Sequence, residues 1–412
     1  MSADTRSNRI SRRRFLGTSA AAAAAVTIVP RRVLGGPGET APSDTITYGV
    51  IGNGGRKDSG MRRWKCCERI AVCDVDTKRI GGDRDGKSRF TDFRKMLERK
   101  DIDAVAIGTP PHWHAIPCIM AAEAGKDIFC EKPMTKFIAE GRAVADAVKR
   151  YGVVFQIGTF GRFGKQNEAN RENHKIIQYG LIKDLSDMVV TASGKNRIGQ
   201  TALPKQEVPE ELDYDFWLGP APYKPYNKDR VHYKNRFYWD YEGGDLTNFG
   251  FHSLDPVQWV IAKDDTSPVK VRPGPAPWPQ HPDAVCPFSW TESTYADGLR
   301  LVLGGGSIKA AYDRPKKRSS VSVKDLDEAA RKRYDELPDP PKLVEFDVAV
   351  KTRQQAGGNA ESSHRCSALM NLANIAIRLN RTLEYDPVKE EIVGDEEANR
   401  FVNIPMRAPW HL

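Results

Sequence analysis

Between residues 45 and 158, short apolar runs alternate with stretches of helical periodicity. Five runs of three or four residues are apolar on both faces, and they span 48–51, 70–73, 104–107, 128–130 and 153–155. A strand that is apolar on both faces is buried on both, as in a parallel sheet covered by helices. The pattern therefore predicts an α/β fold with a doubly wound parallel sheet over residues 45–165.

The pattern changes after about residue 165. Aromatic residues become more frequent, a proline-rich segment covers 273–287, and residues 288–311 have the pattern of strands joined by glycine-rich turns. Residues 296–298, with the sequence Ala-Asp-Gly, are typical of a hairpin turn. One later segment has the spacing of an amphipathic helix, carried by Leu369, Leu372, Ala376 and Leu379. We expect residues 166–412 to form an α+β domain with a large, mostly antiparallel sheet.

The first 36 residues carry most of the excess positive charge. The whole chain has 63 Lys and Arg against 54 Asp and Glu, and residues 1–36 hold seven of the arginines and one acid. Within them, Arg12 and Arg13 precede Phe15 and an alanine-rich run that is too short and too weakly apolar for a stable membrane span. This order is typical of a twin-arginine (Tat) signal. We expect residues 1–36 to be a signal peptide read by the Tat export machinery, and the protein to be periplasmic or otherwise exported.

The remaining residues have a balanced charge. Residues 37–412 carry a net charge of only +3, with Lys and Arg scattered among acids, which argues against nucleic acid as a partner. No pair among the seven cysteines has Cys-x-x-Cys spacing, so no metal site is predicted. The cysteines are expected to be mainly buried small hydrophobes, and they stand at positions 66, 67, 73, 118, 130, 286 and 366.

A glycine-rich loop directly follows the first apolar run, and it consists of Gly52, Asn53, Gly54, Gly55 and Arg56. Glycines there let the backbone approach a pyrophosphate at a helix N-terminus. Asp74 ends the second run, where a carboxylate accepts hydrogen bonds from the ribose hydroxyls of an adenosine and repels a 2′-phosphate. The sequence therefore predicts NAD as the cofactor, with NADP less favoured. Lys57 occupies the position of the motif's third glycine.

The third and fourth runs both end in polar segments. Ligands of doubly wound sheets bind outside the carboxyl ends of the strands, so both segments are expected to face the cofactor. The candidate cofactor-binding residues in them are Thr109, Pro110, His112, His114, Glu131 and Lys132. Lys132, between a strand end and a proline, can also donate a hydrogen bond to a reacting substrate oxygen and stabilise the charge that develops there.

Together these motifs resemble the Gfo/Idh/MocA family, which includes glucose-fructose oxidoreductase and inositol dehydrogenase. The segments 215–222, 236–241, 395–399 and 407–410 are similar to its secreted bacterial branch, and the resemblance covers 45–412. It implies an NAD-binding Rossmann domain at 45–165. It also implies a substrate-binding domain with an open-faced sheet at 166–412, whose C-terminal segment returns to the Rossmann domain and which forms homodimers or homotetramers. The implied activity is hydride transfer at a secondary alcohol of a sugar, sugar derivative or cyclitol.

The resemblance also implies roles for individual residues. Lys132 matches the family's catalytic lysine, and His252 matches the histidine that abstracts the hydroxyl proton, a role suited to a pKa near working pH. Where the family commonly has Asp, four residues before His252, this chain has Asn248, which can orient a substrate but cannot carry a proton. Asp245 or Asp255 could supply the missing carboxylate. Candidate sugar contacts, from rings that stack on sugar faces and arginines that bind hydroxyls, are Arg162, Arg236, Tyr238 and Trp239.

Two other interpretations keep the same fold. In one, transient oxidation of a sugar carbon acidifies the neighbouring C–H bond, a glycosidic substituent is eliminated, and the carbon is reduced again, so that the protein is a glycosidase or lyase. In the other, motivated by Asn248, the protein binds a sugar without turnover. Because free NAD is scarce outside the cytoplasm, an exported enzyme of either catalytic kind is expected to retain its cofactor.

Overall fold

The computed structural model describes most of the chain from residue 44 onward. The described ranges are 44–55, 60–81, 88–159, 161–163, 165–182, 187–192, 199–275, 281–285, 287–305, 312 and 321–412. The predicted signal peptide lies outside them, as do Arg56, Lys57 and Cys286. Residues 46–412 form one unit, which carries two separate sheets.

The first sheet is parallel throughout, with the strand order β3-β2-β1-β4-β5-β6. Its strands are β1 (Ile46–Ile51), β2 (Cys67–Cys73), β3 (Arg89–Phe90), β4 (Ala104–Ile107), β5 (Asp127–Glu131) and β6 (Phe155–Gly158). The order reverses at β1, which is the switch point where doubly wound sheets bind ligands. β4 is buried at every position and β1 at all but one, because helices and loops cover both faces. The doubly wound sheet is confirmed.

Short helices follow the strands of this sheet. They are η2 (Met61–Arg63), α3 (Thr77–Ile80), α4 (Phe93–Leu97), α5 (Pro111–Glu123) and α6 (Ile138–Tyr151). α5 starts at a proline, which needs no amide partner in the first turn, and ends just before Gly125, whose φ of +69° suits glycine. The Glu140 carboxylate caps α6 by accepting the N–H of Phe137 at 3.0 Å. The two longer helices therefore begin and end at residues suited to helix termini.

The second sheet has the order β12-β11-β8-β9-β10-β7. Its strands are β7 (Asp187–Ala192), β8 (Lys270–Pro273), β9 (Trp290–Thr294), β10 (Arg300–Gly305), β11 (Leu383–Asp386) and β12 (Glu391–Ile392). Only the β10–β7 pair is parallel among these described strands, and the other four pairs are antiparallel. The mostly antiparallel sheet is therefore confirmed, and the predicted turn at 296–298 joins β9 to β10.

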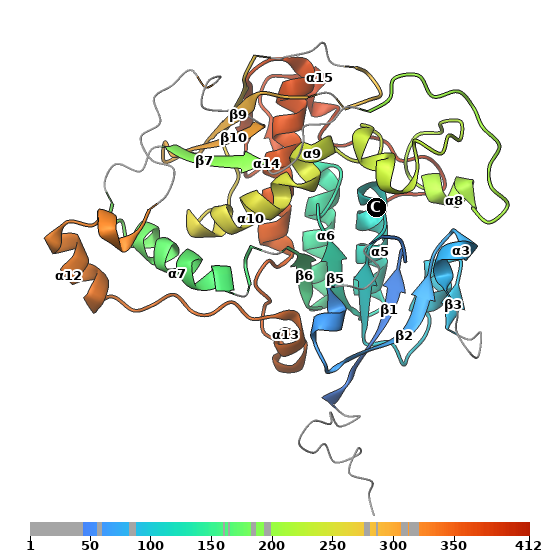
Figure 1. Ribbon diagram of the computed structural model, residues 1–412, viewed down its shortest axis with the longest axis horizontal. Coiled ribbons are helices and arrows are strands. Elements are labelled where there is room, and N and C mark those ends of the chain that lie inside the picture. Colours follow the sequence, from blue (N-terminus) through green and yellow to red (C-terminus); the bar gives the residue numbers. More distant parts are fainter. Residues whose placement is uncertain are drawn as a thin grey trace, which may run out of the picture. The chain divides into compact units, whose positions relative to one another are not determined.

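The second half of the chain adds further helices to both sheets. They are α7 (Lys165–Gln178), α8 (Tyr214–Leu218), η3 (His232–Phe237), α9 (Gly244–Asn248), α10 (Gly250–Val260), η4 (Val323–Asp325), α12 (Glu328–Glu336), α13 (Phe346–Thr352), α14 (Ala360–Leu379) and α15 (Glu396–Asn399). α14 is the predicted amphipathic helix, and it packs against α6 on one side and against β8 and β9 on another (Figure 1). It thereby joins the two sheets.

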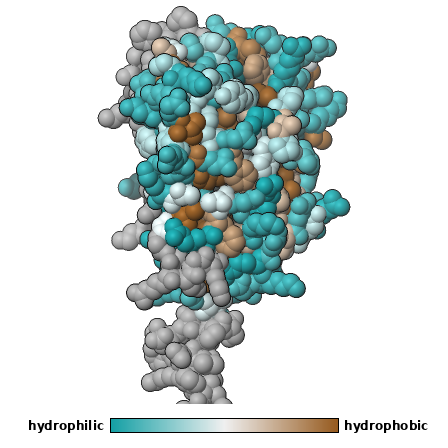
Figure 2. Space-filling view, turned by 90° about the vertical axis from the view of Figure 1, so that its right-hand side faces the viewer, coloured by the Kyte–Doolittle hydropathy of each residue, from teal (hydrophilic) through white to brown (hydrophobic). Residues whose placement is uncertain are grey.

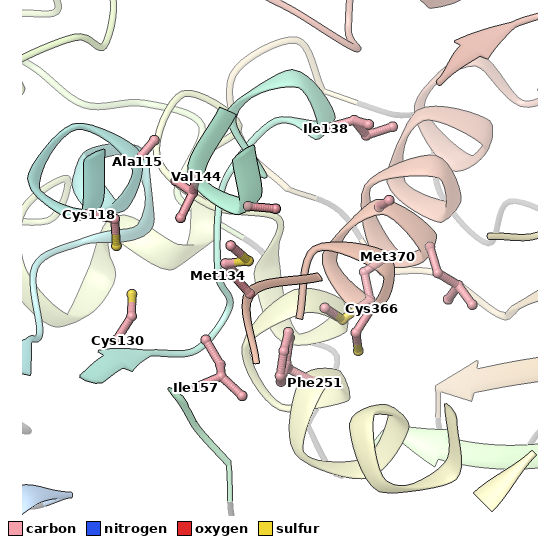
Figure 3. Packing of buried hydrophobic residues seen from close by; sticks show 14 of the residues in the cluster. Ala115, Cys118, Cys130, Met134, Ile138, Val144, Ile157, Phe251, Cys366 and Met370 are labelled. Atoms are coloured by element: carbon pink, nitrogen blue, oxygen red, sulfur yellow. The ribbon is translucent and has the colours of Figure 1, made fainter. Parts of the chain in front are cut away.

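One hydrophobic core runs through both halves of this unit. Figure 3 shows Met134, which follows β5, pointing toward Cys366 and Met370 of α14, with Ile157 of β6 and Phe251 of α10 beside them. The C-terminal segment also reaches the first half, since the ring of Trp410 lies 4.7 Å from that of Trp113 in α5. A continuous core holds the loops of the first sheet and the helices α9 and α10 in one arrangement.

The described cysteines are free, and four of them are buried, namely Cys73, Cys118, Cys130 and Cys366. The surface carries no broad apolar area on the face drawn in Figure 2, where hydrophobic residues lie in small patches among hydrophilic ones. Within the described ranges, no helix combines the length and the apolar composition that crossing a membrane requires.

Candidate active site

A cleft of about 590 Å³ lies at the carboxyl ends of the parallel strands. It is lined by residues that end β1, β2, β4 and β5, and by three segments of the second half, at 216–217, 232–236 and 248–249, together with Glu242. Its volume is in the usual range for small-molecule and cofactor sites. The cleft therefore has one wall from the first sheet and another from the chain beyond residue 200.

Asp74 ties the glycine loop to the end of β2. Its Oδ2 accepts the N–H of Asn53 at 2.8 Å, and its Oδ1 accepts the N–H of Asp76 at 3.0 Å. Burial raises the pKa of Asp74, while these two N–H groups and the nearby Arg79 guanidinium lower it. The side chain of Asn53 in turn donates to the carbonyl oxygen of Arg79 at 2.5 Å. The predicted ribose carboxylate is thus fixed at the cleft wall.

The neighbouring residues fit a dinucleotide. Gly54 and Gly55 line the cleft, and a Cβ atom on Gly55 would meet no atom within 4 Å, so the backbone there is open to a ligand. The hydroxyl oxygen of Thr109, also at the cleft, is buried and has no hydrogen-bond partner among the described residues. Gly52 has a φ of +85°, and a Cβ atom there would lie 2.6 Å from the Thr109 nitrogen, so this position requires glycine. These features fit the prediction that Thr109, Pro110 and the glycines hold NAD, and the assignment of these residues stays a prediction.

Neither predicted cofactor-binding histidine lines the cleft. His114 bridges two loops, with Nδ1 2.8 Å from the Pro133 oxygen and Nε2 2.8 Å from the Thr109 oxygen. His112 lies beneath the aromatic core with Nε2 3.1 Å from the Trp217 oxygen, and burial lowers its pKa to about 3. Both rings are turned toward protein carbonyls because α5 starts there and packs inward. These two residues position the cleft wall instead of touching a cofactor, which corrects the prediction.

Lys132 and Asn248 meet at the other end of the cleft. The Lys132 ammonium donates a hydrogen bond of 2.8 Å to the backbone oxygen of Asn248, the last residue of α9. Arg236 of η3 donates from Nη1 to the side-chain oxygen of Asn248 at 2.9 Å. All three residues line the cleft, as does Glu131. Segments 116 residues apart in the chain thus form one polar group around Asn248.

Glu242 belongs to the same group, and the sequence predictions missed it. It lines the cleft, its exposed fraction is 2%, and the nearby Asn248 side chain favours its carboxylate form and so lowers its pKa. Burial raises its pKa, against the attraction of Lys132 and Arg236. The available signal was an acid directly before two glycines, six residues ahead of Asn248. An acid in that setting is also typical of an ordinary turn, so the signal was weak.

His252 lies beyond this group. It occupies the first turn of α10, one helix after Asn248, and its side chain is half-buried. In the part of the chain that the structure describes, the residues lining the cleft do not include His252. The structure therefore brings Lys132 and Asn248 together, and the role of His252 as the base stays a prediction.

Arg162 is not a sugar contact. Its exposed fraction is 1%, and its Nε donates to Asp255 at 2.8 Å while both terminal nitrogens donate to Asp264, at 2.6 and 2.7 Å. This arrangement joins the segment after β6 to α10 and leaves no donor directed at the cleft. It also engages Asp255, which therefore does not supply the carboxylate that position 248 lacks.

The predicted aromatic contacts belong to the interior as well. Tyr238 is buried against the guanidinium of Arg230, 4.8 Å from the ring centroid. Trp239 is also buried, and its ring nitrogen donates to the His281 oxygen at 3.1 Å. Both predictions are corrected, since this aromatic run packs a core around η3.

Arg236 is the remaining candidate, and it lines the cleft with a neighbour that the sequence did not single out. The Arg236 guanidinium lies 3.8 Å from the ring centroid of Tyr233, which is 57% exposed and also lines the cleft. An exposed ring stacked by an arginine at the mouth of a cleft can take a sugar face. Tyr233 was hidden in the sequence among several other tyrosines.

A parallel sheet in this strand order, with a glycine loop after β1 and a carboxylate after β2, defines a dinucleotide-binding Rossmann protein. Comparison with family models agrees: residues 46–159 match the NAD-binding Rossmann fold of the Gfo/Idh/MocA oxidoreductase family, and residues 168–412 match its C-terminal alpha/beta domain. The chain belongs to the Gfo/Idh/MocA family of oxidoreductases.

Individual relatives match only in part. Inositol 2-dehydrogenase of Rubrobacter xylanophilus is 31% identical over 139 residues, which are 32% of this chain and 40% of that protein. A glycosyl hydrolase family 109 protein of Shewanella pealeana is 28% identical over 175 residues, covering 34% of this chain and 38% of that protein. The match thus spans less than half of either relative.

Among solved structures, the WlbA dehydrogenase of Bordetella pertussis, in complex with NADH and UDP-GlcNAcA, is similar in fold with a TM-score of 0.54. The alignment covers 83% of this chain and 99% of that one at 15% identity.

Proposed function

We propose that this protein is an exported NAD-dependent oxidoreductase that acts on a secondary alcohol of a sugar, sugar derivative or cyclitol. The observation that carries the proposal is the continuity of one cleft. The glycine loop and Asp74 line one end, and Lys132, Asn248 and Arg236 line the other. A dinucleotide bound at the first end would bring its reactive ring toward the second. The name of the Rubrobacter relative supports the polyol class of substrate.

The residues of the reacting end have distinct tasks in this proposal. A bound NAD supplies the acceptor for the hydride that leaves the alcohol carbon. Lys132 donates a hydrogen bond to the alcohol oxygen and stabilises the negative charge that develops as the proton departs. Arg236 and Tyr233 bind the remaining hydroxyls and a ring face of the substrate. The family resemblance assigns proton abstraction to His252.

The second half of the chain supports retention of the cofactor. Its segment before η3 is anchored on the end of β2, where Thr77 donates to the Glu211 oxygen at 2.9 Å and Asp213 donates to the Val75 oxygen at 3.0 Å. From there η3 runs along the cleft and contributes four of its lining residues. A cofactor held between this segment and the ends of the parallel strands would be contacted from two sides, so dissociation is expected to be slow. Slow release of NAD suits an exported enzyme. The arginine-rich segment at residues 1–36 supports the proposal that the protein is exported.

Retention also fits the second candidate function. A glycosidase that oxidises, eliminates and reduces again needs no net supply of NAD, and one of the relatives is named as a glycosyl hydrolase. The same Lys132 would hold the oxygen of the transient ketone. We also propose that the protein forms homodimers or homotetramers, and the family resemblance is the basis for this.

The test starts from protein purified without added cofactor, denatured, and analysed by mass spectrometry for released nucleotide. We expect close to one NAD or NADH per chain and no NADP. Adding myo-inositol and related polyols should then change the NADH absorbance. Cleavage of an aryl glycoside without net NADH would favour the second candidate. An empty protein that also fails to bind added NAD would overturn both.

A further inference from the structure

Three carboxylates line the cleft among the described residues, and they differ in what they face. Asp74 lies at the ribose end and already accepts two backbone N–H groups. The Glu131 carboxylate lies toward β6, where a Cβ atom on Gly158 would be 3.2 Å from it. Glu242 alone of these three lies within the group around Asn248.

We propose that Glu242 is a catalytic residue of this site and accepts the proton of the substrate hydroxyl that Lys132 holds. This inference rests on the proposed function and keeps its reaction and substrate class, but it moves proton abstraction from His252, which the family resemblance implies, to Glu242. Glu242 then supplies the carboxylate that position 248 lacks. Sequence reasoning looked for that acid at Asp245 or Asp255. The structure offers it instead from the loop between η3 and α9, two residues before α9 begins.

Asn248 connects Glu242 to both cations of the site. Its side-chain oxygen accepts from Arg236 at 2.9 Å, so its NH₂ group is the part that can donate to the Glu242 carboxylate. Its backbone oxygen accepts from Lys132 at 2.8 Å. An Asp at 248 would place two carboxylates side by side and could not donate. The departure from the family pattern therefore has a physical reason, because an amide at 248 fits next to a carboxylate at 242.

One oxygen of Glu242 remains available for a substrate. Its Oε1 atom is buried and has no hydrogen-bond partner among the described residues, although the residue lines the cleft. A buried carboxylate oxygen without a donor is costly, and a substrate hydroxyl can satisfy it. Lys132 lines the same cleft and its charge attracts the Glu242 carboxylate, so the polar group around Asn248 offers a substrate hydroxyl both a donor and an acceptor.

The charges around Glu242 suit a base. Burial raises its pKa above the ordinary 4.5, and Asp245 adds to the rise, while Lys132, Arg236 and the hydrogen bond from Asn248 lower it. Lys136, fully buried behind the site, also interacts with this carboxylate, and burial lowers the pKa of that ammonium to about 8. A carboxylate that binds a proton more tightly than usual is a stronger acceptor, as a general base requires.

The step balances as follows. The O–H bond of the alcohol breaks and its proton goes to Oε1 of Glu242, which becomes a neutral carboxylic acid. The electron pair of the carbon–hydrogen bond leaves with that hydrogen as hydride to the oxidised nicotinamide, and a carbon–oxygen double bond forms. The substrate is oxidised by two electrons. Lys132 keeps its hydrogen bond to the oxygen throughout.

The test compares Glu242→Gln with His252→Gln in the holoprotein. Glu242→Gln keeps the shape and the hydrogen bond to Asn248, and we expect kcat to fall by about 10²- to 10⁴-fold with the NAD content and Tm retained. Because protonation removes the base, kcat/KM of the parent falls as pH drops through the pKa of Glu242, and this acid limb should vanish in Glu242→Gln. His252→Gln should lose less activity and keep the limb. Glu292→Gln, a buried glutamate of β9, controls for loss of a buried carboxylate and should keep kcat.

A second readout needs no turnover. The infrared difference spectrum, parent minus Glu242→Gln, should show the band of one protonated carboxylic acid that titrates above pH 4.5, on top of the bands that Glu140 and Asp255 give in both proteins. Near-parental kcat in Glu242→Gln, or an acid limb removed only by His252→Gln, would overturn the assignment of the base. A parent that binds NAD and shows the band but turns over no polyol or glycoside would count against the proposed function instead.

Discussion

The two ends of the cleft are built in different ways. At the dinucleotide end, the contacts that shape the wall come from residues within the first two strands and their loops, such as the hydrogen bond from Asn53 to Asp74. At the reacting end, Lys132, Arg236 and Asn248 come from segments up to 116 residues apart. The first end is local and uses mainly backbone groups, whereas the second depends on side chains that only the packing of α9 and η3 against the first sheet brings together.

Because of this difference, the two ends place different demands on the amino-acid sequence. A dinucleotide binds where the protein backbone can approach its pyrophosphate closely, and a glycine-rich loop after a strand permits that approach. An alcohol substrate needs a hydrogen-bond donor and a proton acceptor at fixed positions. Lys, Arg, Asp and Glu can fill these roles but occur all along the chain, so the residue type alone does not locate the site. Arg162 and Arg236 illustrate the point, since one is buried in a structural ion pair and the other lines the cleft.

The largest expected effect is the loss of stability on replacing the buried Arg162. Arg162→Met should lower the free energy of unfolding by about 3–5 kcal/mol, because Asp255 would stay buried without its counter-ion. Urea denaturation measures this, with Arg171→Met on α7 as the control, since that guanidinium binds the Pro340 backbone oxygen and pairs with the exposed Glu168 carboxylate at 3.9 Å. If Arg162→Met stayed stable but lost substrate affinity, the placement of Arg162 outside the reacting end would be wrong.

Lys132→Met tests the reacting end. Removing a donor aimed at a developing negative charge costs about 10²–10³ in kcat, and we expect that loss without a change in bound NAD. Lys126 provides a matched control at the opposite end of β5, where its ammonium donates to the oxygens of Arg99 and Ile102 at 2.7 and 2.9 Å. Lys126→Met should reduce stability and keep kcat. Equal losses of kcat in both variants would contradict the division of roles.

Asp74→Asn tests the dinucleotide end and should have the smallest effect. Hydrogen bonds to charged groups contribute about 1.5–3 kcal/mol, so NAD affinity should fall by about 10- to 100-fold while binding of NADP becomes relatively more favourable. Titration of the apoprotein with each nucleotide measures both. Asp103→Asn is the control, because Asp103 accepts the N–H of Thr47 at 2.8 Å at the amino ends of β1 and β4, away from the cleft. Unchanged preference for NAD would remove Asp74 from the ribose site.

The sequence predicted those strands and helices in which hydrophobic residues recur at a short, regular spacing. The apolar runs located β1, β2, β4 and β5, whereas the fifth run reached only the first residue of β6 and no run predicted β3. The spacing from Leu369 to Leu379 located α14. Burial on one or both faces of an element imposes a hydrophobic period that can be detected in the sequence. The predicted roles of His112 and His114 failed although their positions were right. A residue just beyond a strand end can point into the crevice or back into the core, and the packing of α5 makes that choice.

By itself, the sequence determined a doubly wound sheet, a second sheet of mostly antiparallel strands, a glycine loop followed by Asp74, and Lys132 at the end of β5. These features depend on local backbone preferences and on hydrophobic periodicity. Only the tertiary structure decided that Arg236 and Glu242 join Lys132 around Asn248, and that Arg162, Tyr238 and Trp239 do not. The reason is physical: which distant side chains share a cleft depends on how helices pack, and no period in the chain encodes that packing.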